Sequence, residues 1–216
     1  GEEGFCPDCV KALPWIGDWV CSRCGVSMPE GSEAELCRDC RRSPRFYDSI
    51  RSVFFFASPV REALLAWKYH GKQKNGELLG KYLADFIKTA DFPPQVDFII
   101  PVPISERKFK ERGFNQAELL AEYAALSLGV MVKPVILKRV RDTLSQSSLK
   151  KAERFENVRG AFKLFYPNRV RGKRVLVVDD IVTSSATINE CARLLKNAGA
   201  VEVYGLTLCG RSLSGK

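Results

Sequence analysis

Two adjacent carboxylates, Asp179 and Asp180, stand between a short apolar run and a series of hydroxyl side chains. The run, residues 175–178, reads Val-Leu-Val-Val and predicts a buried β-strand. A predicted helix follows, and the residues at its start are small or carry hydroxyls, which is more than an N-cap alone requires: Thr183, Ser184, Ser185, Ala186 and Thr187. Such a turn offers backbone N–H groups and the positive end of a helix dipole to a phosphate.

The two acids would repel a phosphate, so they must serve another part of the same ligand. Carboxylates accept hydrogen bonds from ribose hydroxyls, or hold Mg²⁺ that those hydroxyls also bind. Ligands of open α/β sheets bind at the carboxyl ends of the strands, where Asp179 and Asp180 are expected to lie. A phosphate, hydroxyls and a metal together describe a ribose 5-phosphate.

Six of the eight cysteines form three Cys-x-x-Cys pairs. Two such pairs separated by about a dozen residues make a tetrahedral thiolate site for Zn²⁺. Disulfides are the alternative, but the acidic start of the sequence does not resemble a secretory signal, so zinc is favoured. We assign the metal to two pairs that flank a short turn: Cys21, Cys24, Cys37 and Cys40. Cys6 and Cys9 then hold half a site, which a further pair upstream of this chain would complete.

The elements that must position these groups follow from hydrophobic periodicity. Strands are predicted over residues 53–57, 98–104, 132–137, 175–178 and 201–208. Helices are predicted over residues 60–68, 77–89, 115–128 and 186–197. This alternation predicts an α/β fold with a mainly parallel sheet in residues 50–216, preceded by a cysteine-rich module in residues 1–45 with a linker at 41–44. Cys191 and Cys209 are expected in the core.

The charge of the chain is strongly basic and unevenly placed. Its 216 residues carry a net charge of +9, and the first 45 residues hold six basic and eight acidic groups, so the excess lies in the remainder. A basic body attracts polyanions: nucleic acid, acidic lipid headgroups or a phosphorylated small molecule. No apolar run approaches the roughly 20 residues that span a bilayer, so we expect no transmembrane segment and a cytoplasmic location.

Residues 175–187 resemble the phosphoribosyl pyrophosphate signature of type I phosphoribosyltransferases. Other segments resemble one branch of that fold, the competence protein F (ComF) family. These are residues 67–71 (Trp-Lys-Tyr-His-Gly), 100–103 (Ile-Pro-Val-Pro) with 111–116 (Glu-Arg-Gly-Phe-Asn-Gln), and 139–162 with Thr143, Gln146, Leu149, Arg154, Asn157 and Phe162. The resemblance covers nearly the whole chain, including the cysteine module, and implies a type I phosphoribosyltransferase fold behind a zinc ribbon.

The resemblance also implies a role for individual residues. Asp179 and Asp180 would act on the ribose, and the hydroxyl-rich turn would hold the 5-phosphate. The pyrophosphate would lie at the turn of Val102 and Pro103, neutralised by nearby basic residues: Arg107, Lys108 and Arg112. Residues 139–154 would form a mobile loop over the site, excluding water from the reaction. No obvious general base is present, and the single histidine, His70, is the one candidate.

Two functions of different classes remain open. The first is Mg²⁺-dependent transfer of a phosphoribosyl group from phosphoribosyl pyrophosphate to an unknown nucleophile. The second is an adaptor without catalysis that keeps the pocket and binds single-stranded DNA or a protein partner. The resemblance implies a part in natural transformation, with partners in the DNA-uptake machinery at the inner face of the membrane. Fold alone does not choose between the two.

Overall fold

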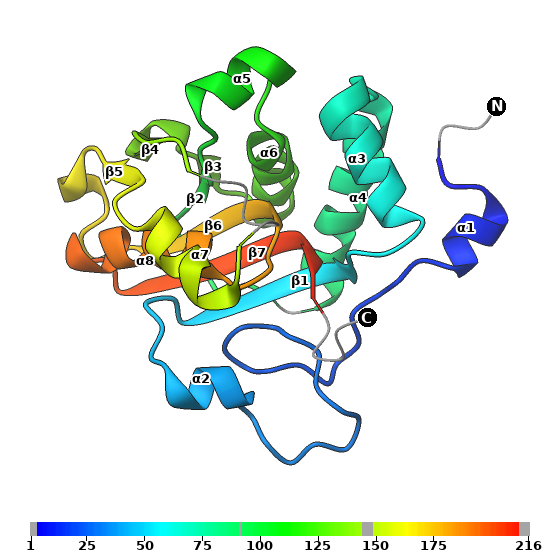
Figure 1. The fold of residues 1–216 in the computed structure, drawn as a ribbon, viewed down its shortest axis with the longest axis horizontal. Helices are drawn as coiled ribbons and strands as arrows, with labels where there is room; N and C mark the ends of the chain where they lie inside the picture. The colour runs from blue at the N-terminus through cyan, green and yellow to red at the C-terminus, as the bar shows by residue number, and fades with distance from the viewer. Residues whose placement is uncertain (1–3, 91, 144–148, 212–216) are drawn as a thin grey trace.

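A computed structural model describes residues 4–90, 92–143 and 149–211 of the chain. The strands among these residues are β1 (Ser49–Phe55), β2 (Phe98–Pro101), β3 (Met131–Val132), β4 (Leu137–Arg139), β5 (Phe162–Leu164), β6 (Arg174–Ile181) and β7 (Glu202–Gly210). Five of them form the central sheet in the order β1-β7-β6-β2-β3, and every neighbouring pair in it runs parallel (Figure 1). β4 and β5 make a separate antiparallel pair.

Helices cover both faces of this sheet. The described helices are α1 (Pro7–Lys11), α2 (Arg38–Arg42), α3 (Val60–His70), α4 (Gln73–Thr89), α5 (Glu106–Arg112), α6 (Gln116–Leu128), α7 (Lys151–Val158) and α8 (Ala186–Asn197). The apolar faces of α3, α4 and α6 share one core cluster with the sheet. The apolar face of α8 shares a second cluster with the opposite side. Covered in this way, the central strands can be apolar throughout.

Strand β6 shows how the sequence builds both halves of the core. Successive side chains of a strand point to opposite faces. Val175 and Val177 belong to the cluster on the α8 side, whereas Leu176 and Val178 belong to the cluster on the side of α3, α4 and α6. All four are completely buried. The apolar run predicted as a strand is therefore the middle of the molecule, and its carboxyl end carries the two acids.

The cysteine-rich module packs along the first strand of the sheet. Ile50 at the start of β1 donates its N–H to the carbonyl of Arg23 at 2.7 Å, and the Arg51 guanidinium donates to the carbonyl of Ser22 at 3.0 Å. In Figure 1 the part of the module that carries α2 lies below β1, whereas α1 lies at the right of the view. Its centre is a small apolar cluster of its own that includes Cys21, Val26, Cys37 and Cys40.

The structure confirms the predicted α/β fold with a zinc-ribbon module, and corrects the details around proline. The strand predicted over residues 132–137 is wrong, because a 3₁₀ turn at Pro134–Ile136 separates β3 from β4. The strand predicted over residues 98–104 ends at Pro101. Pro103, which follows the end of β2, and Pro134 have no N–H to donate to a sheet, which accounts for both interruptions. Helix α2 also extends into the expected linker. Cys191 and Cys209 are fully buried, as predicted.

Candidate functional site

Asp179 and Asp180, the acid pair, lie at the carboxyl end of β6. Asp179 is in register with Thr207 of β7, and its Oδ1 accepts the N–H of Asp180 at 2.8 Å. Burial, and then repulsion by Asp180, raises the pKa of the Asp179 carboxyl to about 7. The acid pair therefore occupies a desolvated position in which a further positive charge is favourable.

One positive charge is supplied by Lys68 of α3. Its Nζ lies 2.7 Å from Oδ2 of Asp180, and the two side chains are 9% and 17% exposed. Lys68 was not among the site residues predicted from the sequence. The one signal that could have found it is its place in the 67–71 segment, which carries part of the family resemblance.

Between β6 and α8 the chain forms the 182–185 turn. Within the described part of the chain, the backbone N–H groups of Thr183, Ser184 and Ser185 donate to no protein acceptor. Ser185 is the N-cap of α8 and has a φ of 61°, a left-handed conformation that is costly for any residue with a side chain. Successive unpaired N–H groups at a helix N-terminus form a concave site for an anion.

The acid pair and the 182–185 turn border a cavity of about 440 Å³, here called the main cavity. This volume is within the range of small-molecule sites. The predicted site residues that line it are Asp179, Asp180, Val102, Lys108, Arg112, Thr183, Ser185, Ala186 and Thr187. Residues far apart in the chain are thus brought together around one cavity. Side chains from α3 that the prediction lacked also line it, namely Arg61, Leu65, Lys68 and Tyr69.

The main cavity also has a group of basic side chains in its lining. These are Lys108, Arg112 and Arg139. Burial lowers the pKa of Lys108, and the charges of Arg139 and Arg112 lower it further. Burial also lowers the pKa of Arg139, which donates a hydrogen bond to Thr143. These crowded cations would be relieved by a bound anion. The middle of the predicted mobile loop, residues 144–148, lies outside the described residues.

Three predicted or candidate residues are placed elsewhere. Arg107 is not part of the lining and instead pairs with Glu111 at 2.6 Å and Asp142 at 3.4 Å. Ser184 is 5% exposed and borders a separate small cavity behind the 182–185 turn. His70 is exposed at the end of α3 and does not line the main cavity. The geometry therefore gives neither Arg107 nor His70 a direct contact with a ligand in that cavity.

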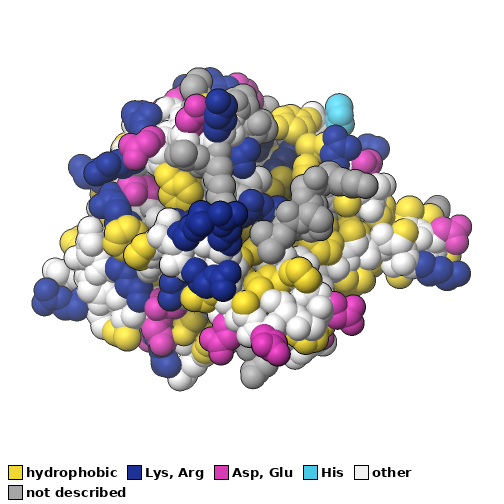
Figure 2. Space-filling view, turned by 60° about the horizontal axis from the view of Figure 1, so that its bottom comes forward, with side chains coloured by type: hydrophobic (Ala, Val, Ile, Leu, Met, Phe, Trp, Pro, Cys, Tyr) yellow, Lys and Arg dark blue, Asp and Glu magenta, His cyan; other side chains and the backbone are white. Residues whose placement is uncertain are grey.

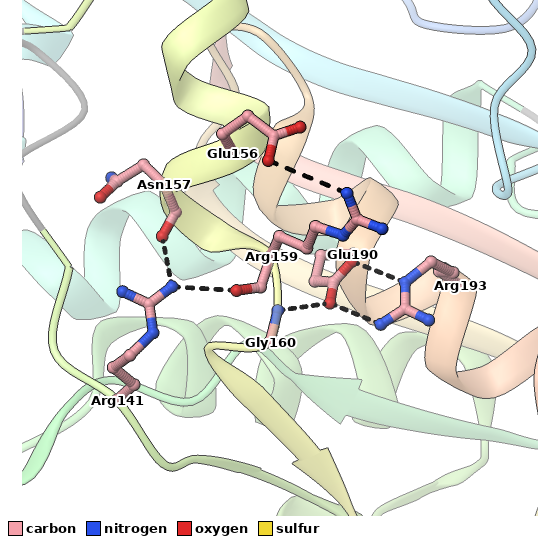
Figure 3. Close-up of polar contacts among 7 residues, drawn as sticks. All are labelled: Arg141, Glu156, Asn157, Arg159, Gly160, Glu190 and Arg193. Carbon is pink, nitrogen blue, oxygen red and sulfur yellow. Dashed lines mark hydrogen bonds and ion pairs between the residues drawn. The ribbon is translucent and has the colours of Figure 1, made fainter.

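A polar network fixes the segment that carries Arg139 to the helix that follows the 182–185 turn. The Arg141 guanidinium donates to the carbonyls of Asn157, at 3.0 Å, and Arg159, at 2.9 Å (Figure 3). The neighbouring Gly160 donates its N–H to Oε1 of Glu190, on α8, at 2.9 Å. Figure 3 shows that these contacts join the end of α7 to α8. The segment that carries Arg139 and the helix that follows the 182–185 turn are therefore held by a common support.

Four cysteines of the N-terminal module form a metal-ligand set. The sulfur atoms of Cys21, Cys24, Cys37 and Cys40 all lie within 4.8 Å of one another. The backbone N–H of Cys37 donates to Sγ of Cys21 at 3.3 Å, a contact that favours a thiolate. Four converging thiolates fit Zn²⁺ in a closed structural site. This four-cysteine cluster contains the ligands predicted from the spacing, and the Cys6–Cys9 pair is not part of it.

Comparison with known proteins gives the same two parts. A phosphoribosyl transferase domain model matches residues 116–215, and a double zinc ribbon model matches residues 1–41. DNA utilization protein YhgH of Salmonella typhi is 31% identical over 209 residues, which cover 95% of this chain and 90% of that protein. Competence protein F of Haemophilus influenzae is 28% identical over 95% of this chain and 90% of its own length. Competence protein ComFC of Bacillus subtilis is 30% identical over 96% of this chain and 84% of its own length.

Among solved structures, glutamine phosphoribosylpyrophosphate amidotransferase from B. subtilis is similar with a TM-score of 0.42 and 18% identity. The match covers 66% of this chain and spans 30% of that enzyme. In the described residues, no helix combines the length and the apolar character that a membrane crossing requires.

Proposed function

We propose, on the premise that this chain belongs to the competence protein F (ComF) family of phosphoribosyl transferase-like proteins, that it binds phosphoribosyl pyrophosphate together with Mg²⁺. One observation carries the proposal. The acid pair and the unpaired N–H groups of the 182–185 turn border one cavity that Lys108, Arg112 and Arg139 also line. A sugar with a phosphate at one end and a pyrophosphate at the other matches that distribution of charge.

The ligand would lie with its 5-phosphate on the N–H groups of the 182–185 turn, where the dipole of α8 adds a favourable field. Its ribose hydroxyls would then reach Asp179 and Asp180. The pyrophosphate would extend toward Val102, with Lys108 and Arg112 as counter-ions. Each phosphate group would thus contact N–H groups or cations, and the hydroxyls would contact the acceptors.

The acid pair also fits Mg²⁺, which binds proteins through one or two carboxylates together with phosphate oxygens of the substrate. Asp179 and Asp180 are the carboxylates at this edge of the main cavity. When bound, the ion would neutralise charge that develops on a departing pyrophosphate. We include Mg²⁺ in the proposed complex for this reason.

A transferase would break the bond between C1′ and the pyrophosphate oxygen and form a bond from C1′ to an acceptor nucleophile. Lys108, Arg112 and Arg139 would then stabilise the leaving pyrophosphate. The acceptor is left unspecified. Release of inorganic pyrophosphate in the presence of a candidate acceptor would identify this activity, and binding without release would identify the adaptor.

The adaptor function has its own support. The net charge is +9, and Figure 2 shows Lys and Arg side chains gathered near the middle of one face with few acidic ones among them. Related proteins carry the names competence protein and DNA utilization protein. We propose a part in DNA uptake from the cytoplasmic side, with single-stranded DNA or uptake proteins at the inner membrane face as partners. Affinity for a labelled oligonucleotide that falls steeply with salt would support phosphate contacts, and a flat response would contradict them.

Calorimetric titration of the zinc-loaded protein with phosphoribosyl pyrophosphate and Mg²⁺ tests the proposed ligand. Asp179→Asn and Asp180→Asn are each expected to weaken binding roughly tenfold or more, because hydrogen bonds to charged groups contribute about 1.5–3 kcal/mol. Asp97→Asn is the matched control, since Asp97 precedes β2 at the amino-terminal ends of the strands, whereas the acid pair lies at the carboxyl end of β6. No heat with wild-type protein, or equal losses in all three variants, would overturn the proposal.

We further propose that residues 1–45 and 50–216 form the zinc-ribbon and transferase-like parts, and that the four-cysteine cluster holds one Zn²⁺. Cys6 and Cys9 lie outside this cluster, and two thiolates alone are too few for a tetrahedral zinc site. Native mass spectrometry of residues 1–216 should then find a single tightly bound zinc ion. Two zinc ions on this chain alone would contradict the assignment of Cys6 and Cys9.

A further inference from the structure

The side chain of Tyr47 connects the zinc ribbon to the 182–185 turn. It lies between α2 and β1 in the chain, is 2% exposed, and places its hydroxyl 2.8 Å from Oγ of Ser185. Oγ of Ser185 is in turn 2.6 Å from the carbonyl oxygen of Ser184. Because a serine hydroxyl has one proton and a carbonyl can only accept, Ser185 donates to Ser184. Tyr47 is therefore the donor in its bond to Ser185.

This bond acts on the residue that shapes the turn. Ser185 adopts the left-handed conformation described above without being a glycine, so surrounding contacts must hold it there. Its carbonyl also accepts the N–H of Asn189 at 2.8 Å, which is the first turn of α8. The direction of the N–H groups in the 182–185 turn thus depends on the position of Ser185.

On its other side Tyr47 faces the four-cysteine cluster. A cavity of about 20 Å³, room for about one water molecule, separates the two. It is bordered by Cys24 and Cys40 on the ribbon side, by Tyr47, and by Ser184 and Ser185 of the turn. A change in the position of the cysteine loops would therefore reach the 182–185 turn through a single layer of side chains.

Two further contacts fix the ribbon to the sheet. Gly25, directly after Cys24, has a φ of 65° and lies so close to the carbonyl of Ile50 that a Cβ would collide with it. Asp39, next to Cys40, forms an ion pair of 3.3 Å with Arg211, directly after β7. The ribbon therefore contacts the sheet both at β1 and just after the end of β7.

We infer that Tyr47 is a positioning residue through which the metal-loaded ribbon sets the geometry of the anion-binding 182–185 turn. In addition to any partner that it binds, the ribbon thereby supports the ligand site. As a statement about phosphoribosyl pyrophosphate the inference rests on the proposed function. As a statement about the turn it is independent of any ligand.

Hydrogen exchange followed residue by residue by NMR tests the inference on the zinc-loaded protein. The reporter is the Asn189 amide, which bonds to the Ser185 carbonyl. Tyr47→Phe keeps the ring and removes the donor, and we expect exchange of this amide to accelerate roughly two- to tenfold, as the loss of one hydrogen bond allows. Zinc content should be unchanged. Tyr204→Phe, at a buried tyrosine of β7 that packs on Phe92, is the matched control and should leave the Asn189 amide unaffected.

Zinc removal by a chelator completes the test. In wild-type protein it should accelerate exchange at Asn189 at least as much as Tyr47→Phe does, and in the Tyr47→Phe variant it should add little. Unchanged exchange in Tyr47→Phe, or equal acceleration by chelation with and without the hydroxyl, would overturn the inference. The affinity for phosphoribosyl pyrophosphate should fall under the same changes that accelerate exchange of the Asn189 amide. If wild-type protein does not bind that ligand, the proposed function fails while the exchange result still decides the role of Tyr47.

Discussion

Replacing Lys68 by methionine tests the electrostatic basis of the acid pair. Nζ of Lys68 and Oδ2 of Asp180 are 2.7 Å apart, and at an effective dielectric constant of about 20 this attraction is worth about 6 kcal/mol before the cost of desolvation. Removing one partner of a buried ion pair costs about 3–5 kcal/mol, because the other charge is left uncompensated. The Asp180 side chain remains 17% exposed at the main cavity, so we expect about 3 kcal/mol, at the lower end of that range.

Urea unfolding at pH 7 of wild-type protein, Lys68→Met, Asp180→Asn and the double variant measures this coupling. Asp180→Asn should restore much of the stability in the Lys68→Met background, because it removes the unpaired charge. Lys88→Met is the matched control: Lys88 pairs with Asp85 at 3.4 Å, both are more than 60% exposed, and such pairs contribute little. A loss below about 1 kcal/mol in Lys68→Met, or strictly additive effects in the double variant, would refute the reasoning.

Three further predictions concern residues outside the lining of the main cavity. Arg141→Ala should lower the free energy of unfolding by about 1–2 kcal/mol, since it removes two hydrogen bonds to carbonyls, and calorimetry should find weaker phosphoribosyl pyrophosphate binding than in Arg141→Lys. Gly25→Ala should lower the free energy of unfolding by about 2 kcal/mol or more, because Gly25 has a positive φ and a Cβ would collide with the Ile50 carbonyl. An unchanged midpoint in urea unfolding would contradict the packing of the ribbon on β1. The N–H of Arg174 holds the pKa of Asp97 below its usual range, so this carboxylate stabilises the fold above the unfolded pKa of about 3.9 and loses that effect as pH falls. Asp97→Asn should therefore flatten the acid limb of a curve of stability against pH. Identical curves for the variant and the wild-type protein would refute this.

The sheet could be predicted because its signals are local. A strand buried on both faces is a continuous apolar run, and residues 175–178 have no other plausible structure. Helix α6 has a sequence signal at each end: the Asn115 side chain caps its N-terminus, and Gly129 adopts the left-handed conformation at its C-terminus. Residues 132–137 misled the prediction because their apolar letters serve a 3₁₀ turn as readily as a strand. The deciding feature was Pro134, which has no N–H to donate to a sheet ladder.

Only part of the site was accessible from the sequence. Asp179 and Asp180 are consecutive at a strand end, so residue type and position together indicate their chemistry. Lys68 and Tyr47 reach the site from distant parts of the chain, and only the folded structure shows which partner each one meets. Arg107 shows the opposite error. It is adjacent to Lys108 in sequence, but consecutive residues of a helix point about 100° apart, and α5 directs Arg107 to Glu111 instead of the main cavity.

A crystal structure of the zinc-loaded protein with phosphoribosyl pyrophosphate and Mg²⁺ is the most direct measurement of the proposed complex. The account predicts electron density for the 5-phosphate within hydrogen-bonding distance of the N–H groups of Thr183 and Ser185, which line the main cavity. It predicts the ribose hydroxyls at the acid pair and the pyrophosphate near Lys108. Density for the phosphate elsewhere on the protein, or a main cavity that stays empty at saturating ligand, would contradict it.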